Sequence, residues 1–221
     1  MTVSSRSAWA HVNLNSLAEN LRAVWKGRPK RSIIAVVKAD AYGHGAVKVA
    51  RRLADEGATM LAVANVAEAA ELKSAGIDTP VLLLGAYMRT ECEDILDLDA
   101  ATSISSVAFA EDLDRAASRR KARARVHVKV DTGMSRLGIP AAKAIEAIER
   151  VSVLSNLVIE GIFTHFASAD EEDKTFTMRQ VAEFNRVIST VEGMGIKFKY
   201  IHAAATAACM ELPEAHFNCL R

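Results

Sequence analysis

Residues 33–64 read IIAVVKADAYGHGAVKVARRLADEGATMLAVA, and the order strand, helix, strand can be recognised in them. Both ends are short runs of small, apolar and β-branched residues, 33–37 and 60–64, which are typical of buried strands. The segment between them, 46–57, is amphipathic and ends in glycine, a common signal for the end of a helix. This order predicts two parallel strands joined by a helical crossover.

The same alternation recurs along the rest of the 221 residues. Further helices are expected at 65–76 and from about residue 171 to residue 192. With the first two, eight strands are predicted: 33–37, 60–64, 81–84, 101–104, 126–130, 157–163, 199–202 and 218–221. Eight such units favour an α/β fold of the (β/α)8 TIM barrel type over an open doubly wound sheet. No linker interrupts them, so residues 1–221 are expected to form one domain.

Composition and charge narrow the classes of partner. Lys and Arg number 28 and Asp and Glu 27, and the net charge of +1 gives no reason to expect nucleic acid or an anionic membrane. The N-terminal residues lack the apolar core of a secretory signal, and no apolar run approaches the roughly 20 residues that span a bilayer. Three widely spaced cysteines indicate reduced thiols and a cytoplasmic protein.

Polar side chains follow several of the predicted strands, at the end where a barrel places its chemistry. They are Lys38, Tyr42, Asp131, Thr132, Gly133, Arg136, Thr164, His165, His202, Thr206 and Arg221, with glycine included as part of a polar turn. An ordinary surface also carries charge, so position alone is a weak signal. The mixture is more informative, because cations outnumber carboxylates and therefore favour an anionic ligand such as a phosphate ester or a carboxylate. No metal site is expected.

Lys38 allows two interpretations. A lysine at the end of a strand is often only a solvated charge. A lysine that is partly desolvated among other cations loses its proton more readily, and its amine can then condense with an aldehyde. Pyridoxal phosphate is such an aldehyde and also carries a dianionic phosphate. The small residues around Tyr42 would let the backbone approach such a ligand closely.

The sequence resembles the alanine racemases, which are pyridoxal-phosphate enzymes of fold type III, over essentially its whole length. Four motifs carry the resemblance in the family's order: AVVKADAYGHG (35–45), VHVKVDTGMSRLG (126–138), GIFTHFASADE (161–171) and HAAAT (202–206). The first two are long and specific. The resemblance implies a cytoplasmic isomerase that interconverts L-alanine and D-alanine, the latter a peptidoglycan precursor.

The resemblance also implies roles for the residues around the cofactor. Lys38 would carry pyridoxal phosphate and act as one of two bases, and Tyr42 would bind the cofactor phosphate. Arg136 would donate a hydrogen bond to the phenolic oxygen of the cofactor and favour the substrate carboxylate. The alternatives are an aromatic ring packed under a loop for Tyr42 and an ordinary surface arginine for Arg136.

Arg221 would face the pyridine nitrogen of the cofactor, supported by His165 and His202. Because arginine does not readily give up a proton, that nitrogen would stay unprotonated, and the ring would be a weaker electron sink. This suits racemisation better than transamination. Either histidine alone is more often an ordinary core residue.

Lys129 shares one face of its predicted strand with His127 and Asp131, because side chains alternate along a strand. It can simply pair with Asp131. The resemblance implies another state, a carbamylated lysine, in which the cation becomes an anion that can hold Arg136.

The sequence departs from the family at two places. Ala205 and Thr206 stand where Asn-Ser is usual, and the Thr206 hydroxyl can still donate to a phosphate oxygen while Ala205 cannot replace an amide. Family members also continue beyond the position of Arg221 with a phosphate-binding segment, a last barrel helix and a β-rich domain. In the head-to-tail homodimer that domain supplies a tyrosine as the opposite base, a role that neither Tyr87 nor Tyr200 fits. The resemblance is therefore to the barrel portion, and the 221 residues alone are expected to be weak or inactive.

Two other functions remain open at this point. One is a non-catalytic pyridoxal-phosphate-binding barrel involved in cofactor homeostasis, which the chain length fits but the motifs AYGHG and DTGMSRLG do not. The other is a phosphate-binding barrel, or an interaction fragment, without this cofactor. The assignment of alanine over another amino acid as substrate comes from the resemblance only.

Overall fold

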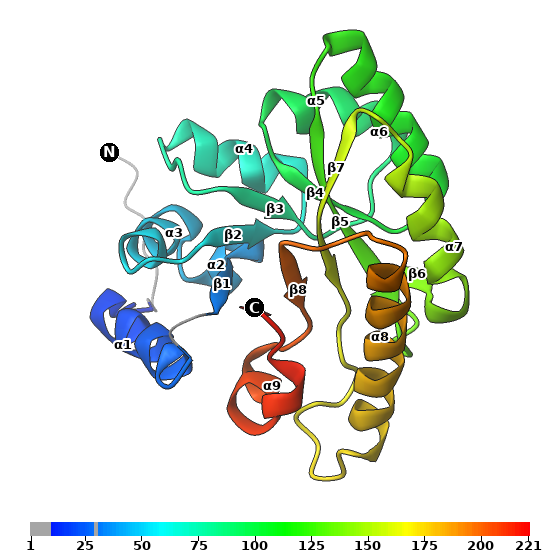
Figure 1. Cartoon of the computed structure of the whole chain (residues 1–221). Coiled ribbons are helices and arrows are strands. Elements are labelled where there is room, and N and C mark those ends of the chain that lie inside the picture. Colours follow the sequence, from blue (N-terminus) through cyan, green and yellow to red (C-terminus); the bar gives the residue numbers. More distant parts are fainter. Residues whose placement is uncertain (1–9, 29–30) are drawn as a thin grey trace.

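The computed structural model describes residues 10–28 and 31–221, and in it eight parallel strands close into a barrel (Figure 1). They are β1 (Ser32–Val36), β2 (Met60–Val63), β3 (Val81–Leu83), β4 (Ala101–Ile104), β5 (Ala124–Asp131), β7 (Leu157–Phe163), β8 (Tyr200–His202) and β9 (Cys219–Leu220). β1 pairs with β2 on one side and with β9 on the other, which closes the ring. The predicted TIM barrel is confirmed, and the ends of the predicted strands lie within two residues of the observed ones.

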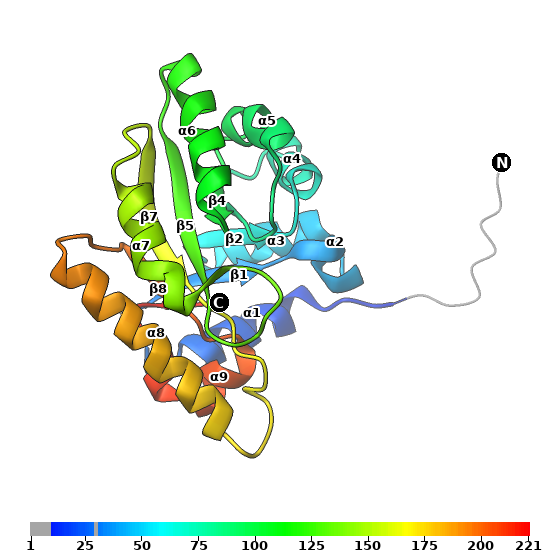
Figure 2. The same cartoon turned by 90° about the vertical axis from the view of Figure 1, so that its right-hand side faces the viewer.

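Helices surround this barrel (Figures 1 and 2). The longer ones are α1 (Leu14–Trp25), α3 (Ala46–Asp55), α4 (Val66–Ser74), α6 (Val107–Arg120), α7 (Ala141–Ser152) and α8 (Thr175–Gly193). The shorter elements are α2 (Lys38–Gly43), η1 (Arg89–Glu91), α5 (Cys92–Asp97), α9 (Thr206–Glu211), η2 (Pro213–Ala215) and the strand β6 (Ile139–Pro140), which pairs with β5. Gly57 and Gly76 follow α3 and α4 with positive φ, as the glycine signals predict. The third predicted helix begins later than expected, at Thr175.

The strands are buried on both faces. Ile34 and Met60 belong to a cluster inside the barrel, together with Tyr200 and Cys219. Side chains alternate along a strand, so Leu61 points the other way and packs in the layer between the barrel and the helices. Burial on both faces explains why the strands read as continuous apolar runs.

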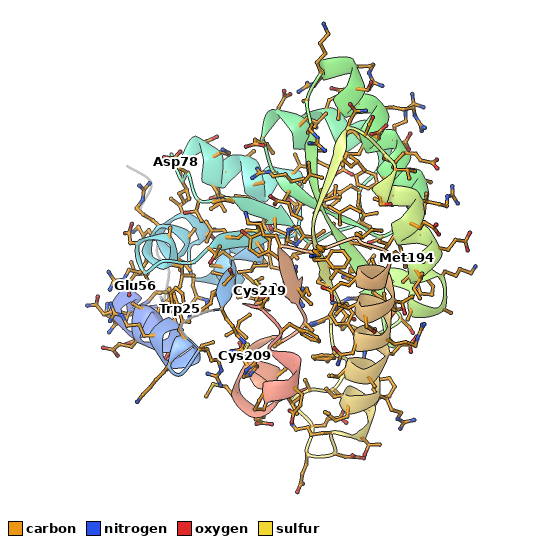
Figure 3. All side chains as sticks on the ribbon, in the orientation of Figure 1. Trp25, Glu56, Asp78, Met194, Cys209 and Cys219 are labelled. Atoms are coloured by element: carbon orange, nitrogen blue, oxygen red, sulfur yellow. The ribbon has the colours of Figure 1, made fainter. Side chains whose placement is uncertain are left out.

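α1 precedes the first strand and lies beside α9 in both views (Figures 1 and 2). Arg22 on α1 forms an ion pair with Glu56, at 2.6 Å, near the end of α3. Trp25 and Glu56 lie close to each other on this side of the molecule (Figure 3). Arg28 continues the link to α9, because its guanidinium donates to the carbonyl oxygen of Cys209 at 2.9 Å. These contacts hold α1 against the first and last parts of the barrel.

Cys92, Cys209 and Cys219 are buried and form no disulfide. Figure 3 shows Cys209 on α9 and Cys219 on β9, both beside the closing strands. Within residues 10–28 and 31–221, no helix combines the length and the apolar character needed to cross a bilayer. The expectation about the N-terminal segment concerns residues 1–9, which lie outside the described residues.

Candidate functional site

A cavity of about 810 Å³, within the size range of small-molecule sites, extends from the carboxyl ends of several strands along β1 to the inner side of α1. Seven of the residues singled out from the sequence line it: Lys38, Tyr42, Lys129, Arg136, His165, Thr206 and Arg221. Another, His202, is fully buried and does not line the cavity. Residues that are far apart in the sequence therefore meet at one place.

The lining of the cavity is mostly apolar, and its charged side chains are cations. Two lysines and two arginines line it, and no Asp or Glu is among its described lining residues. Burial and the nearby Arg221, Arg136 and Lys38 lower the pKa of Lys129 to about 8. Burial and the same cations lower the pKa of His165 to about 4, so its ring is neutral at pH 7. An anionic ligand would relieve the repulsion among these groups.

Lys38 stands at an unusual bend directly after β1. The four residues that follow it, Ala39–Tyr42, all have φ between 50° and 57° and form a left-handed helical turn without glycine. For L-residues this conformation costs roughly 1–2 kcal/mol each, so other contacts must hold it. Within the turn, the amide of Ala41 donates to the carbonyl of Val37 at 2.9 Å, and the Asp40 carboxylate accepts from the amide of Ala46 at 2.6 Å. The turn brings Lys38 and Tyr42 to the same cavity.

Tyr42 lies at the outer edge of the cavity, with 59% of its surface exposed. It is therefore not an aromatic residue packed under a loop, which was one of the two interpretations. Partial burial raises the pKa of Tyr42, and the charge of Arg221 partly offsets that increase. The ring is thus available to a ligand at the mouth of the barrel.

Arg221 is held from several sides. Its guanidinium donates to the carbonyl oxygen of Thr164 at 3.1 Å, and it lies 3.3 Å from Nδ1 of His165 and 3.4 Å from Nδ1 of His202. It also lies over the ring of Phe163, 5.1 Å from the ring centroid. Burial lowers the pKa of Arg221 to about 10, so the guanidinium stays charged at neutral pH. The expected contacts of both histidines with this arginine are present.

A third imidazole, that of His127, continues this network into the barrel. Nε2 of His202 lies 2.9 Å from Nδ1 of His127, and both rings are buried. Because Arg221 can only donate, Nδ1 of His202 accepts and its proton is on Nε2, which donates to His127. Nδ1 of His127 accepts this bond, so the single N–H proton of its ring is on Nε2. That Nε2 has no hydrogen-bond partner among the described residues. Burial lowers the pKa of His127 to about 3 and that of His202 well below its ordinary value, so both rings are neutral.

The sequence analysis placed His127 on the face of Lys129 but gave it no function. The missed signal was Gly161 on the neighbouring strand β7 (Leu157–Phe163), because a Cβ at that position would lie 2.5 Å from Nδ1 of His127. A glycine inside a strand often marks such a close approach. His127 is thus the inner end of a chain that starts at Arg221.

Lys129 does not pair with Asp131, so that interpretation is wrong. The Asp131 carboxylate accepts from the amides of Gly133 and Ser135, at 2.9 and 3.0 Å, and shapes the turn after β5. The ammonium group of Lys129 lies 5.5 Å from the ring centroid of Phe163, and no ion pair of the described residues includes it. Lys129 is therefore a buried cation that faces the cavity.

Glu68 is another residue that the sequence analysis did not single out. It lies in the first turn of α4, and its carboxylate accepts hydrogen bonds from the amides of Ala39 and Ala64, at 2.9 and 2.7 Å. Ala39 directly follows Lys38, so Glu68 contacts the backbone at the bend.

Ala205 and Thr206, where the sequence departs from the family, lie at the start of α9. Ala205 is the N-cap residue and makes no side-chain capping bond, and Thr206 is the first residue of the helix.

Comparisons with known proteins agree on one family. The family described as "Alanine racemase, N-terminal domain" matches residues 12–221. An alanine racemase of Desulforamulus reducens is 43% identical over 215 residues, which cover 96% of this chain and 58% of the relative. One of Methanococcus maripaludis is 38% identical over 98% of this chain and 59% of its own length. The chain thus spans about three-fifths of the length of the curated relatives it matches.

Solved structures give the same result. The alanine racemase of Clostridium difficile 630 in complex with cycloserine has a TM-score of 0.95 at 35% identity, and the match covers 98% of this chain and 60% of that one. The alanine racemase of Bacillus anthracis with bound L-Ala-P has a TM-score of 0.90 at 30% identity, with 98% and 56% covered. At these identities the likeness extends beyond the fold to the sequence.

Proposed function

Because the chain belongs to the alanine racemase family, through its N-terminal domain, we propose that it forms the pyridoxal-phosphate-binding barrel of an amino-acid racemase that interconverts L-alanine and D-alanine. One observation carries the proposal. Lys38, the lysine of the motif AVVKADAYGHG, lines a cavity together with Arg136 and Arg221. Such a site has both an amine for an aldehyde and cations for a phosphate and a carboxylate.

The residues present fit pyridoxal phosphate. The cofactor is an aldehyde with a dianionic phosphate, and the cavity has a lysine, three further cations and no carboxylate among its described lining residues. Once bound, the cofactor supplies an electron-withdrawing ring that makes the α-hydrogen of an amino acid acidic. In this proposal Lys38 holds the cofactor, and Tyr42 and Thr206 donate hydrogen bonds to its phosphate.

Lys38 is also proposed to move the proton. With a substrate amino acid bound, the Lys38 amine would remove or deliver the α-proton on one face of the substrate carbon. Its tether to the end of β1 confines it to that face. Arg136, at the exposed edge of the cavity, attracts the substrate carboxylate and donates to the phenolic oxygen of the cofactor.

Arg221 is proposed to donate to the ring nitrogen of the cofactor without protonating it. Its pKa of about 10 keeps the guanidinium charged at pH 7, and His165 and His202 hold it by accepting its N–H groups. A ring nitrogen that accepts a hydrogen bond but gains no proton is a weaker electron sink. This property favours the return of a proton to the same carbon and therefore racemisation over transamination.

Lys129 is proposed to be carbamylated when carbon dioxide is present. Its pKa of about 8 leaves part of the amine neutral near pH 7.5, and a neutral amine adds carbon dioxide and releases one proton. The resulting anion would lie among Arg221, Arg136 and Lys38 and would remove the repulsion of a buried cation. Incubation with ¹³C-labelled carbon dioxide should give a carbamate signal that the Lys129→Met variant lacks.

The second acid–base group is proposed to come from outside these residues. Racemisation needs proton transfer on both faces of one carbon, and a placed acid or base contributes about 10²–10⁴-fold in rate. The curated relatives are longer than this chain, and we propose that a homodimer partner supplies a tyrosine to the opposite face. The 221-residue chain should then exchange the α-hydrogen of one alanine enantiomer with solvent faster than it racemises alanine. Deuterium incorporation and the D/L ratio measure the two rates, and equal rates at the level of a full-length relative would contradict the proposal.

Lys38 can be tested directly as the cofactor lysine. The chain with added pyridoxal phosphate is reduced with borohydride, digested and mapped by mass spectrometry. The pyridoxyl group is expected on Lys38, and a label on Lys129 or Lys48 in its place would overturn the assignment. Cofactor labelling of Lys38 without any α-hydrogen exchange would instead favour a non-catalytic cofactor-binding barrel.

A further inference from the structure

The hydrogen-bond ladder between β1 and β2 ends in an unusual way next to Lys38. Its last regular bond runs from the amide of Val37 to the carbonyl of Ala62, at 2.8 Å. The next two bonds of a parallel ladder would join the amide of Ala64 to the carbonyl of Val37, and then the amide of Ala39 to the carbonyl of Ala64. Neither is formed: the carbonyl of Val37 accepts from the amide of Ala41 at 2.9 Å, and the carbonyl of Ala64 accepts from the hydroxyl of Tyr87 at 2.8 Å. The amides of Ala64 and Ala39 both bond elsewhere.

Glu68 provides it. One carboxylate oxygen accepts from Ala39 at 2.9 Å, and the other accepts from Ala64 at 2.7 Å. Glu68 is itself fixed, because its own amide donates to the side chain of Asn65, the N-cap of α4, at 2.9 Å. One carboxylate thus joins the ends of two neighbouring strands at the point where the chain leaves β1. Hydrogen bonds to a charged acceptor are among the stronger ones in proteins.

The position of this bridge matters for the turn that follows. Ala39 is the first of the four left-handed residues, and Lys38 immediately precedes it. A backbone in this conformation persists only where its surroundings hold it. The bridge from Glu68 acts at the first residue of the turn, and the bond from the amide of Ala46 to the Asp40 carboxylate acts at the second.

We propose that Glu68 is a positioning residue for Lys38: its carboxylate replaces the next two bonds of the strand ladder and holds the bend from which Lys38 and Tyr42 reach the cavity. The inference rests on the proposed function only in taking Lys38 as the cofactor lysine. The hydrogen bonds from Ala39 and Ala64 to Glu68 do not depend on that function and can be measured without cofactor.

The test compares Glu68→Gln with Glu71→Gln. Both change the same helix in the same way, and Glu71 is exposed with no side-chain hydrogen bond among the described residues. A glutamine has one acceptor oxygen, so one of the two amides faces a donor group. Amide hydrogen exchange of the cofactor-free chain, followed by NMR, should become about 10–100-fold faster at Ala39 or Ala64 in Glu68→Gln, which corresponds to the loss of one hydrogen bond to a charged group. Amides of β5 and β7 should keep their rates, and Glu71→Gln should match the original chain.

The second measurement follows the lysine itself. With pyridoxal phosphate added, the circular dichroism of the visible cofactor band reports how the lysine-bound ring is oriented. Glu68→Gln should change this band and slow borohydride trapping at Lys38, while the overall melting curve stays close to that of Glu71→Gln. An identical band, with unchanged exchange at Ala39 and Ala64, would overturn the inference. If the unsubstituted chain gives no label at Lys38, the proposed function fails while the exchange data still test the bridge.

A variant that keeps the charge covers the case in which Glu68→Gln does not fold. Glu68→Asp shortens the side chain by one methylene, so its carboxylate cannot reach both amides from the same helix position. It should release one of the two amides in the exchange experiment. Unchanged protection of both would contradict the proposed bridge.

Discussion

The buried charge of Lys129 lowers the stability of the folded chain. It is buried beside three other cations, and its pKa of about 8 lies well below the ordinary value of 10.5. At pH 7 the lysine is charged in both the folded and the unfolded chain. The folded chain therefore bears the cost of desolvating and crowding that charge, while the unfolded chain does not.

Lys129→Met should stabilise the fold. Methionine keeps much of the side-chain volume and removes the buried charge, so the free energy of unfolding at pH 7 should rise by up to about 3 kcal/mol. Urea denaturation in carbon-dioxide-free buffer measures the change, and Lys143→Met, at an exposed position of α7, is the control, with an expected change within about 0.5 kcal/mol. A loss of stability in Lys129→Met would mean that the ammonium group has a favourable partner.

Three residues show what a sequence can and cannot indicate at this scale. Lys38 and Arg221 were predicted to share a site, because counting strands places both at the same end of a barrel. Glu68 was missed, although Asn65-x-x-Glu68 resembles a capping box, in which the glutamate returns to the N-cap amide. Glu68 accepts from the amide of Ala64 instead, one residue before the N-cap. Its other oxygen accepts from the amide of Ala39, just beyond the end of β1. Such a contact depends on which strands are neighbours, and the spacing of residues along one helix gives no information about that.

At the scale of elements, the left-handed turn after β1 is the part that sequence rules do not predict. Each residue of Ala39–Tyr42 alone favours another conformation, and contacts from α4, from the start of α3 and from the carbonyl of Val37 select this one. The regular elements behave differently. In these elements the local preference of the sequence, apolar runs for strands and glycine after helices, matches the structure that forms. This explains why all eight barrel strands were predicted.

Ala39→Gly should therefore stabilise the chain. Glycine adopts positive φ without the penalty that alanine bears, and this gain of roughly 1–2 kcal/mol exceeds the extra entropy of glycine in the unfolded chain, roughly 0.5–1 kcal/mol. We expect the free energy of unfolding to rise by about 0.5–1 kcal/mol. Ala182→Gly, at an exposed position inside α8, should lower it by about 1 kcal/mol. Chemical denaturation of both variants tests the opposite signs, and a fall in both would argue against strain at Ala39.

At the scale of the whole molecule, the partly buried His165 and the fully buried His127 make stability depend on pH. The folded-state pKa of His165 is about 4 and that of His127 about 3, against an ordinary value of 6.5. As the pH falls below 6.5, the unfolded chain binds protons that the folded chain does not. The stability that these rings contribute is therefore complete above pH 6.5, decreases between about 6.5 and 4, and is lost below the folded-state values.

The urea midpoint of unfolding should accordingly decrease between pH 6.5 and pH 4. His165→Asn should make this decrease shallower, because it removes one of the groups that take up a proton on unfolding. His11→Asn removes an exposed histidine outside the site and serves as the control, with no change of slope expected. A slope that is the same in all three proteins would show that His165 does not contribute to the acid dependence.

The closure of the barrel by β1 and β9 also has a consequence during synthesis. Ser32 lies in register with Cys219, so β1 gains its second neighbour only after nearly the whole barrel has been translated. At about 5–20 residues per second, a ribosome needs roughly 10–40 s to go from one strand to the other. During that interval β1 is an open sheet edge with an apolar sequence, which is a template for pairing with other chains. The nascent protein should therefore depend on chaperones that cover this edge until β9 emerges.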